Sequence, residues 1–508
     1  RTSVDGEVLA EHAQPLARGL NEVDWTLDIN DPLLWWPWSL GAQHLTHIHV
    51  EVVIDGEGSD QRSVRTGLRE VALQDWVFSV NGERLFVKGA NLAPTRAALA
   101  EATPAEVRRD VELARDAGLD LVRVNGHIAR PELYEAADEL GMLVWQDFPL
   151  QWGYARTIRR EAVRQAREAV DLLGHHPSIA VWCAHNEPVM AHDSRGAALG
   201  SSIVRNVLQQ QRPTWNRTIL DRWVKRAFET ADETRTTIAH SGVAPHLPQL
   251  DGTDSHLFFG WYHGEGADVD GFAASLPRMV RFVSEFGAQS VPTSADFMDP
   301  QRWPALDWHH LTEHHGLQID SFEQHVPPGG YSTFEAWRDA TQRYQAELLR
   351  HHIETFRRLK YRPTGGFCFL GLNDPSPAVS WGVLDHMRQP KLAYHAVTEA
   401  CLPVIVVADR LRDSLFAGEA IALDVHVVSD LRALLEDVQC TATLRWPGGS
   451  HEWSWTGDVP PDSSVRVGTA QFVVPEMAGE LWFDLTLQHP DAAATNRYAS
   501  IVAPRRNG

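Results

Sequence analysis

Eight short apolar runs, most of them followed by a helical segment, constrain the fold of this chain more than any other feature. Nearly every run ends in polar or charged residues, as expected where buried parallel strands deliver side chains at their carboxyl ends. The predicted strands are Arg84–Asn91, Leu119–Gly126, Met142–Phe148, Ile179–Glu187, Thr236–Gly242, Thr253–Phe258, Arg281–Gly287 and Gly366–Asp374. Eight strand–helix units predict a TIM (β/α)8 barrel over residues 76–400. An open doubly wound sheet is the alternative, but no glycine-rich phosphate-binding turn follows the first strand.

The segments between these runs carry helix signals. Thr103, Pro104 and Glu106 stand where a capping residue, a first-turn proline and the third residue of a capping box belong. A helix is therefore expected to begin there and to end at Gly118. Further helices are predicted at 131–140, 161–173 and 218–234.

The two ends of the chain alternate between apolar and polar residues, which is typical of antiparallel sheets with one buried face. Residues 1–75 show this pattern at Trp25–Ile29 and His47–Val52, and residues 401–508 show it again. We expect a partial β-sandwich at 1–75 and a second sandwich at 401–508. Half a sandwich leaves an open edge and an uncovered apolar face, so we expect a companion N-terminal chain or a homo-oligomer to complete it.

Charge and cysteine usage narrow the possible partners. The formal net charge of -21 argues against nucleic acid and anionic membranes and fits a neutral ligand. No apolar run approaches the roughly 20 residues of a membrane span. The four cysteines have neither pairing nor metal spacing, so we expect buried free thiols, no disulfide framework and no cofactor. The absence of that framework favours a cytoplasmic location over a secreted one.

The run HPSIAVWCAHNEP, residues 176–188, presents the first candidate catalytic acid. Its apolar part stops just before the polar pair Asn186 and Glu187. A carboxylate here has no Lys or Arg within its own loop and precedes a proline, so it is costly to place unless chemistry uses it. A helix cap or a buried ion pair is the alternative interpretation of Glu187.

A second carboxylate, Glu285, follows an apolar strand and precedes the residue pair Phe286–Gly287, which lets the chain turn at once. The strands that carry Glu187 and Glu285 are the fourth and seventh, and both should end at the barrel mouth. Glycosidic cleavage needs such a pair, because one carboxyl group protonates the leaving oxygen and the other attacks the anomeric carbon. A separation of about 5 Å would indicate retention of configuration.

Together these motifs resemble glycoside hydrolase family 2, a retaining family built on the (β/α)8 barrel. Pro32–Leu45 and Thr66–Glu70 resemble its immunoglobulin-like domain and the exit from that domain, and Leu140–Phe148 resembles its third barrel strand. The resemblance implies that the flanking β-sandwiches are immunoglobulin-like. It also implies that Glu187 is the acid/base and that Glu285 is the nucleophile.

Within the family, the strand ends are most similar to the β-mannosidase branch, which makes Trp381 the platform under the sugar in subsite −1. The chain departs from that branch at Asn125–His127 and Leu370–Gly371. These residues are expected to determine which sugar is bound. Exo-β-glucosaminidase and β-galactosidase specificities stay open as alternatives, and so does a catalytically silent carbohydrate-binding protein on this fold. The matching motifs are 254–256 with 262–264, and 372–374 with 379–381.

Other strand-end residues are expected to contact the sugar or to support the two glutamates. Arg123 ends the second strand, where a fixed positive charge would keep Glu285 ionised; a structural salt bridge is the alternative. His256 is expected to hydrogen-bond a sugar hydroxyl or the nucleophile, with plain packing as the alternative. The remaining predicted substrate-binding residues are Asn125, Trp145, Asp147 and, by resemblance and for the sugar 2-hydroxyl, Asn186.

The histidine-rich segment Trp308–His315 raises a metal hypothesis, because His310 and His314 are four residues apart on a possible helix. No third ligand follows at a matched spacing, so we predict a solvated loop near the active-site rim and no metal. A formal glycosylation sequon at Asn216–Thr218 lies at an expected helix start, and such triplets arise by chance.

Overall fold

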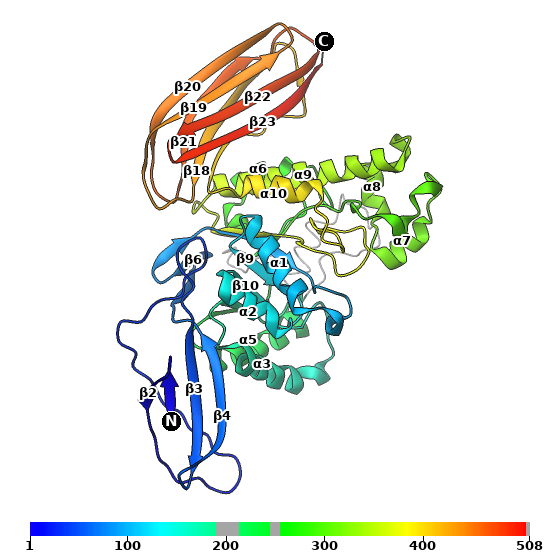
Figure 1. Ribbon diagram of the computed structural model, residues 1–508. Helices are drawn as coiled ribbons and strands as arrows, with labels where there is room; N and C mark the ends of the chain where they lie inside the picture. The colour runs from blue at the N-terminus through cyan, green and yellow to red at the C-terminus, as the bar shows by residue number, and fades with distance from the viewer. Residues whose placement is uncertain (189–212, 244–253, 504–508) are drawn as a thin grey trace.

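The computed structural model describes residues 1–188, 213–243 and 254–503, with an α/β region between two β-rich ends (Figure 1). The central region is built on a curled sheet of eight strands in the order β12–β11–β10–β9–β8–β15–β14–β13, all recorded pairs being parallel. The last strand, β15, pairs with the first, β8, so the sheet winds in one direction, unlike a doubly wound sheet. The strands are β8 Val87–Leu92, β9 Leu121–Val124, β10 Leu143–Asp147, β11 Ile179–Cys183, β12 Thr236–Ile238, β13 Ser255–His256, β14 Phe282–Glu285 and β15 Gly366–Phe369.

All eight predicted strands are present in the predicted order, but most are shorter than expected. The run Thr236–Gly242 contributes only the three residues of β12. The run Arg84–Asn91 is divided at Phe86 between β7 and β8. The predicted start at Thr253 lies outside the described residues, and within those that are described no pairing joins β12 to β13.

Helices follow most of the strands, and α1 begins at the predicted cap. The Thr103 hydroxyl accepts the Glu106 backbone N–H at 3.3 Å, and the Glu106 carboxylate accepts the Thr103 backbone N–H at 2.9 Å. None of the described helices has the length and hydropathy needed to cross a membrane. The α-helices are α1 Pro104–Asp116, α2 Pro131–Leu140, α3 Arg159–Leu173, α5 Asp221–Ala231, α6 Asp268–Ser275, α7 Trp308–His315, α8 Ile319–His325, α9 Phe334–Arg358 and α10 Leu392–Ala400. The shorter helical segments are η1 Leu99–Glu101, η2 Arg156–Ile158, the π-helical η3 Trp215–Leu220, η4 Pro277–Val280, η5 Asp296–Met298, η6 Pro300–Arg302 and η7 Pro328–Gly330.

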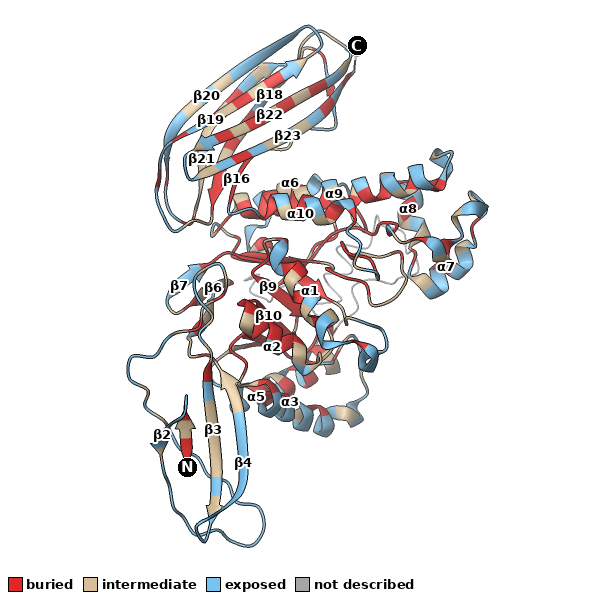
Figure 2. Ribbon diagram, viewed as in Figure 1, coloured by how far each residue is buried: buried red, intermediate tan, exposed pale blue. Residues whose placement is uncertain are grey.

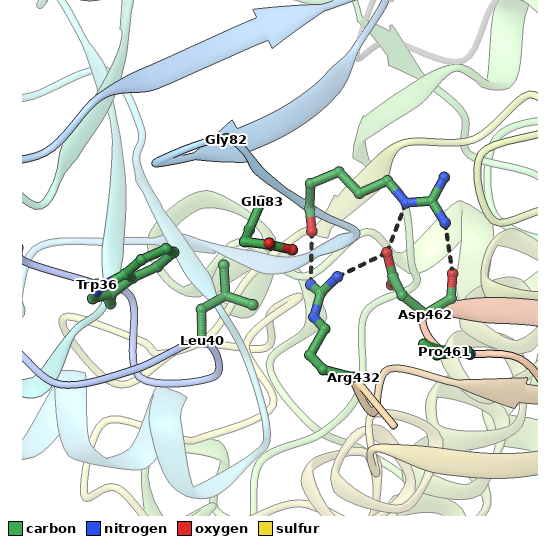
Figure 3. A pocket seen from close by; sticks show the side chains of 8 residues that line it. Trp36, Leu40, Gly82, Glu83, Arg432, Pro461 and Asp462 are labelled. Atoms are coloured by element: carbon green, nitrogen blue, oxygen red, sulfur yellow. Dashed lines mark hydrogen bonds and ion pairs between the residues drawn. The ribbon is translucent and has the colours of Figure 1, made fainter. Parts of the chain in front are cut away.

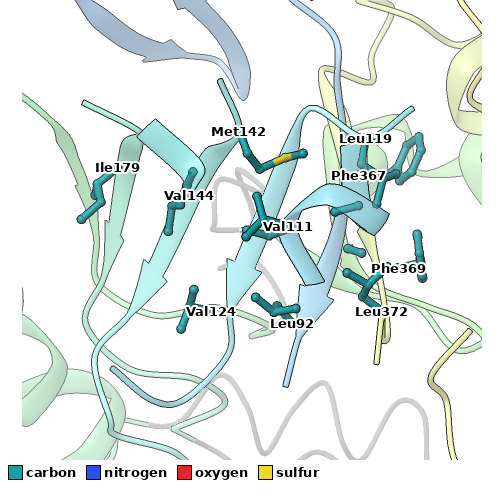
Figure 4. Packing of buried hydrophobic residues seen from close by; sticks show 14 of the residues in the cluster. Leu92, Val111, Leu119, Val124, Met142, Val144, Ile179, Phe367, Phe369 and Leu372 are labelled. Atoms are coloured by element: carbon teal, nitrogen blue, oxygen red, sulfur yellow. The ribbon is translucent and has the colours of Figure 1, made fainter. Parts of the chain in front are cut away.

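Neighbouring residues of one central strand face two different hydrophobic clusters. In β10, Val144 belongs to the cluster between the sheet and the helices, whereas Leu143 and Trp145 belong to the cluster inside the curled sheet. Figure 4 shows the first cluster, in which Val111 of α1 lies among side chains of neighbouring strands. Successive strand residues point to opposite faces, so these strands are buried on both faces, and β9 and β10 are buried along their length (Figure 2).

A small antiparallel sheet closes the inner cluster at the amino ends of the strands. It consists of β5 Val71–Gln74, β6 Val77–Val80 and β7 Glu83–Leu85, and it crosses the predicted boundary at residue 76. The ring of Trp76 lies 5.8 Å from that of Phe282 and 6.2 Å from that of Trp145. The chain passes so close that a Cβ on Gly365 would lie 1.9 Å from the Trp76 carbonyl oxygen, so only glycine fits there.

The N-terminal sheet has the order β2–β1–β3–β4 and exposes apolar side chains. Val8, Leu9, Val52 and Ile54 are between 43% and 60% exposed. The alternating residues Trp25–Ile29 form no strand, so that part of the predicted sheet is wrong. The four strands are β1 Thr2–Val4, β2 Glu7–Ala10, β3 Thr46–Ile54 and β4 Glu57–Thr66.

At the C-terminus, two sheets share one hydrophobic core. Their orders are β16–β18–β21 and β17–β23–β22–β19–β20. Val425 and Val427 of the first sheet belong to the same cluster as Leu444, Phe483 and Leu485 of the second. The strands are β16 Val404–Ala408, β17 Ser414–Phe416, β18 Ala420–Ser429, β19 Leu435–Trp446, β20 Gly449–Val459, β21 Ser463–Val473, β22 Gly479–His489 and β23 Ala492–Ala503.

Ion pairs join this C-terminal region to the central sheet. The Asp430 carboxylate lies 2.9 Å from Nζ of Lys88, 2.8 Å from Arg357 and 2.7 Å from Lys360. Beside it, Asp462 binds Arg84 and Arg432 at the edge of an open pocket of about 670 Å³ (Figure 3). Because Lys88 lies on β8, the C-terminal sheets are tied directly to the first central strand.

Candidate active site

The carboxyl ends of several parallel strands bring the predicted site residues together. β9 ends just beyond Arg123, β10 ends at Asp147, and β14 ends at Glu285. The register pairs Arg123 with Trp145 of β10, and His256 of β13 with Glu285 of β14. The sheet register therefore sets the neighbours of Arg123, His256 and Glu285.

The two candidate glutamates face each other across His256. One oxygen of Glu187, one oxygen of Glu285 and one ring nitrogen of His256 all lie within 4.8 Å of one another. Nδ1 of His256 is 2.7 Å from Oε1 of Glu187 and 3.5 Å from Oε2 of Glu285. Burial lowers the pKa of His256, but the negative charges of Glu285 and Glu187 raise it, and the net pKa is raised.

Arg123 lies in the middle of this group and has no exposed surface. Its guanidinium donates to Oε1 of Glu285 at 3.1 Å, to Oδ2 of Asp147 at 2.9 Å and to Oδ1 of Asn186 at 2.7 Å. Burial raises the pKa of Glu285 above its ordinary value, whereas the positive charges of His256 and Arg123 oppose that rise. The predicted fixed cation beside Glu285 is therefore in place, and it is at the same time part of a buried ion-pair network.

Asn125 adds a second donor to Glu285. Its Nδ2 lies 3.1 Å from the same Oε1 that Arg123 contacts. Asn91, at the end of β8, was not among the predicted site residues, yet it accepts from Asn125 at 3.2 Å and donates to the Ser284 carbonyl at 2.8 Å. The polar end of the first strand was the signal that could have identified Asn91.

Glu187 has a strained backbone that neighbouring loops hold in place. Its φ is +44°, a region that non-glycine residues seldom adopt. Its backbone N–H donates to the Ser241 carbonyl at 3.1 Å, and the preceding Asn186 N–H donates to the Leu150 carbonyl at 2.8 Å. Trp152, which sequence patterns did not indicate, donates its Nε1–H to Oε2 of Glu187 at 3.3 Å.

Trp145 and Asp147 lie behind the site, so of the two roles predicted for them, contact with a sugar and support of the residues that contact it, the first is corrected and the second fits. Both have no exposed surface, and Nε1 of Trp145 donates to Oδ1 of Asp147 at 3.0 Å. Asp147 in turn binds Arg123 through both of its oxygens. Trp145 points into the inner cluster. The two residues therefore support the Arg123 guanidinium from behind.

Trp381 is half-buried and lies in an aromatic group at the mouth of the sheet. Its ring centroid is 5.1 Å from that of Phe258 and 5.7 Å from that of Tyr262. The long helix α9 holds its backbone, because Nε2 of Gln345 donates to the Trp381 carbonyl at 2.9 Å. Phe258 is buried and Tyr262 is partly buried, so both rings pack against the platform that the sequence predicted.

The histidine-rich segment Trp308–His315 is the helix α7, so the predicted loop is wrong. His310 and His314 are exposed on it, with ring centroids 4.7 Å apart. Among the described residues the one group with three potential metal ligands is Glu187, His256 and Glu285. Glu187 is hydrogen-bonded to His256, and Glu285 is held by Arg123 and Asn125.

Comparisons with known proteins show which family this chain resembles. Residues 2–69 match the sequence model of Glycosyl hydrolases family 2. Beta-mannosidase B of Emericella nidulans is 27% identical over 418 residues, which cover 76% of this chain and 48% of that protein. Beta-mannosidase of Bos taurus is 26% identical over 451 residues, which cover 79% of this chain and 49% of that protein. The chain thus spans about half the length of the curated relatives it matches.

Two solved structures share the fold. Beta-D-mannosidase from Dictyoglomus thermophilum has a TM-score of 0.73 and 23% sequence identity, covering 92% of this chain and 58% of that chain. Exo-chitosanase from Amycolatopsis orientalis has a TM-score of 0.70 and 18% sequence identity, and the match covers 92% of this chain and 55% of that chain. These two structures show the fold alone. The family model and the beta-mannosidase relatives confirm the resemblance to glycoside hydrolase family 2 and its β-mannosidase branch.

Replacing Arg123 by methionine should destabilise the protein in a pH-dependent way. The change leaves two buried carboxylates without their cation, which should cost about 3–5 kcal/mol near pH 7. Loss of the cation raises the already raised pKa of Glu285 further, so the destabilisation should shrink as the pH falls through that pKa. Thermal unfolding at pH 7 and pH 5 measures both effects.

Arg109→Met provides the control, because Arg109 pairs with Glu112 at 3.4 Å on the exposed face of α1. That variant should change the unfolding midpoint little at either pH. A loss in Arg123→Met that is the same at both pH values would contradict the assigned charge network.

Proposed function

We propose that this chain carries the active site of a retaining exo-β-glycosidase, most like a β-mannosidase, that cleaves terminal β-linked sugars by double displacement. The observation that carries the proposal is the placement of Glu285 at the end of β14 and of Glu187 just beyond β11 of the same parallel sheet, with carboxylate oxygens within 4.8 Å. Retaining glycosidases hold their two carboxyl groups about 5–5.5 Å apart, so that one can attack the anomeric carbon directly.

The proposed architecture follows from the same arrangement. Residues 76–400 are assigned to a (β/α)8 catalytic barrel, in which no pairing joins β12 to β13 among the residues that the structure describes. Residues 1–75 are assigned to a partial immunoglobulin-like sandwich and residues 401–508 to a C-terminal one. Support comes from the one-directional winding of the eight strands and from the fold shared with the mannosidase structure.

In the first step, Glu285 attacks the anomeric carbon while Glu187 protonates the leaving oxygen. Arg123 and Asn125 both donate to Oε1 of Glu285, which favours its ionised form and leaves Oε2 for the attack. His256 and Trp152 orient the Glu187 carboxyl group through one oxygen each. In the second step, Glu187 takes a proton from water, and that water releases the sugar from Glu285.

The sugar is proposed to rest on Trp381, with Asn186 binding its 2-hydroxyl. The names of the curated relatives favour mannose. A β-glucosaminide or β-galactoside specificity is the rival on this fold, and a carbohydrate-binding protein without turnover is the rival from another class. A panel of aryl β-glycosides separates all of these.

Glu285→Ala should abolish turnover of an aryl β-mannoside, because the glycosyl-enzyme can no longer form. Azide enters the space left by the carboxylate and should restore release of the phenol, giving an inverted mannosyl azide. Product NMR identifies the anomer. Glu229→Ala, on the outer face of α5, is the control and should keep full activity. If azide does not restore turnover, and the residual activity gives a product with retained anomeric configuration, Glu285 is ruled out as the nucleophile.

Glu187→Ala should slow substrates in proportion to their need for a proton. For an alkyl mannoside, kcat/KM should fall by about 10²–10⁴-fold, since general acid catalysis supplies a factor of that size. The dinitrophenolate of a dinitrophenyl mannoside leaves without being protonated. The first step with this substrate should therefore be affected far less. Stopped-flow measurement of both substrates tests this, and an equal fall for the two would remove Glu187 from the acid role.

We also propose that a companion chain covers the N-terminal sheet. Val8, Leu9, Val52 and Ile54 expose a large share of their apolar surface there, and the relatives carry about as much sequence outside the match as within it. Analytical ultracentrifugation with intact-mass analysis of the protein from its natural source should reveal a second polypeptide. A homo-oligomer or a monomeric single chain would refute the companion.

A further inference from the structure

A chain of hydrogen-bonding groups runs from Glu187 through the imidazole of His256 to a buried carboxylate behind it. Nδ1 of His256 lies 2.7 Å from Oε1 of Glu187, and Nε2 lies 3.2 Å from the hydroxyl oxygen of Ser241. That hydroxyl donates to Oδ2 of Asp254 at 2.5 Å. His256 and Asp254 are 3.9 Å apart, too far for a direct hydrogen bond, so Ser241 mediates between them.

The direction of these bonds follows from the chemistry of the groups. An ionised carboxylate only accepts hydrogen bonds, so the single hydrogen of the Ser241 hydroxyl points to Asp254. The hydroxyl oxygen is left as an acceptor toward His256, which requires a hydrogen on Nε2. Ser284 donates to the same Asp254 oxygen, and both serines have no exposed surface.

Ser241 also holds the backbone of Glu187, so one residue positions both partners. Its carbonyl accepts the Glu187 N–H at 3.1 Å. The next residue, Gly242, lies against the imidazole with φ +73°, and a Cβ there would be 2.2 Å from Cε1 of His256. A side chain at that position would displace the ring. The segment Ser241–Gly242 therefore fixes both the position and the orientation of the His256 ring.

We infer that Ser241 and Asp254 are positioning residues that keep a hydrogen on Nε2 of His256 and leave Nδ1 as the ring nitrogen that exchanges a proton with Glu187. One proton is shared between Oε1 of Glu187 and Nδ1. The leaving oxygen takes it in the first step, and the attacking water returns one in the second. The inference rests on the acid/base role proposed for Glu187.

Ser241→Ala tests the inference, because it removes the hydroxyl and keeps the backbone contact to Glu187. Without its acceptor on Nε2, the neutral ring can carry its hydrogen on Nδ1, where it cannot take up the proton of Glu187. We expect kcat/KM to fall by about 10–100-fold for an alkyl mannoside and by less than about threefold for a dinitrophenyl mannoside. Ser178→Ala removes an equally buried serine hydroxyl near the amino end of β11 and should change neither value. An equal fall for both substrates would overturn the inference.

A second measurement does not depend on turnover. Long-range ¹H–¹⁵N spectra of protein with ring-labelled histidine distinguish a protonated from a bare ring nitrogen, and His256→Gln identifies the signal. The native protein and Ser178→Ala should show the hydrogen on Nε2, and Ser241→Ala should show it moving to Nδ1. An unchanged pattern in Ser241→Ala would overturn the inference. If the pattern changes but Glu285→Ala keeps full activity, the proposed function fails and the tautomer assignment stands.

Discussion

The buried guanidinium of Arg123 is the interaction on which the rest of the site depends. It has no exposed surface and binds Glu285, Asp147 and Asn186 at once. A cation in this position offsets the cost of burying two carboxylates, and its planar group fixes their relative orientation. Removing it would leave two carboxylates buried without their cation, so the geometry of the site and the stability of the sheet are linked.

The scaffold makes this burial possible because its strands are covered on both faces. Helices such as α1 cover the outside, and the small sheet β5–β7 fills the amino-terminal end of the inside through Trp76 and Phe78. The charged groups therefore collect at the other end, where the strands finish and loops leave room. On the far side, the ion pairs around Asp430 tie the C-terminal sheets to β8.

The eight strands and the two candidate glutamates could be predicted from the sequence because both follow from a local pattern, an apolar run that ends in a polar residue. It predicted less well what depends on contacts between distant segments. Trp152 and Ser241 reach Glu187 from other loops, and no periodicity marks them. Trp145 stands near a strand end, but its alternate position points it into the core. The run Trp25–Ile29 shows that alternation without a partner strand does not make a sheet.

The measurement that tests the central claim most directly is the capture of the glycosyl-enzyme. A 2-deoxy-2-fluoro-β-mannosyl fluoride transfers its sugar to the nucleophile with loss of fluoride, and the ring fluorine slows the hydrolysis that follows. Mass spectrometry of the intact protein and of its peptides should show one added fluorosugar, bound to Glu285. Inactivation with the label on another residue, or turnover of a mannoside with no label formed at all, would contradict the account.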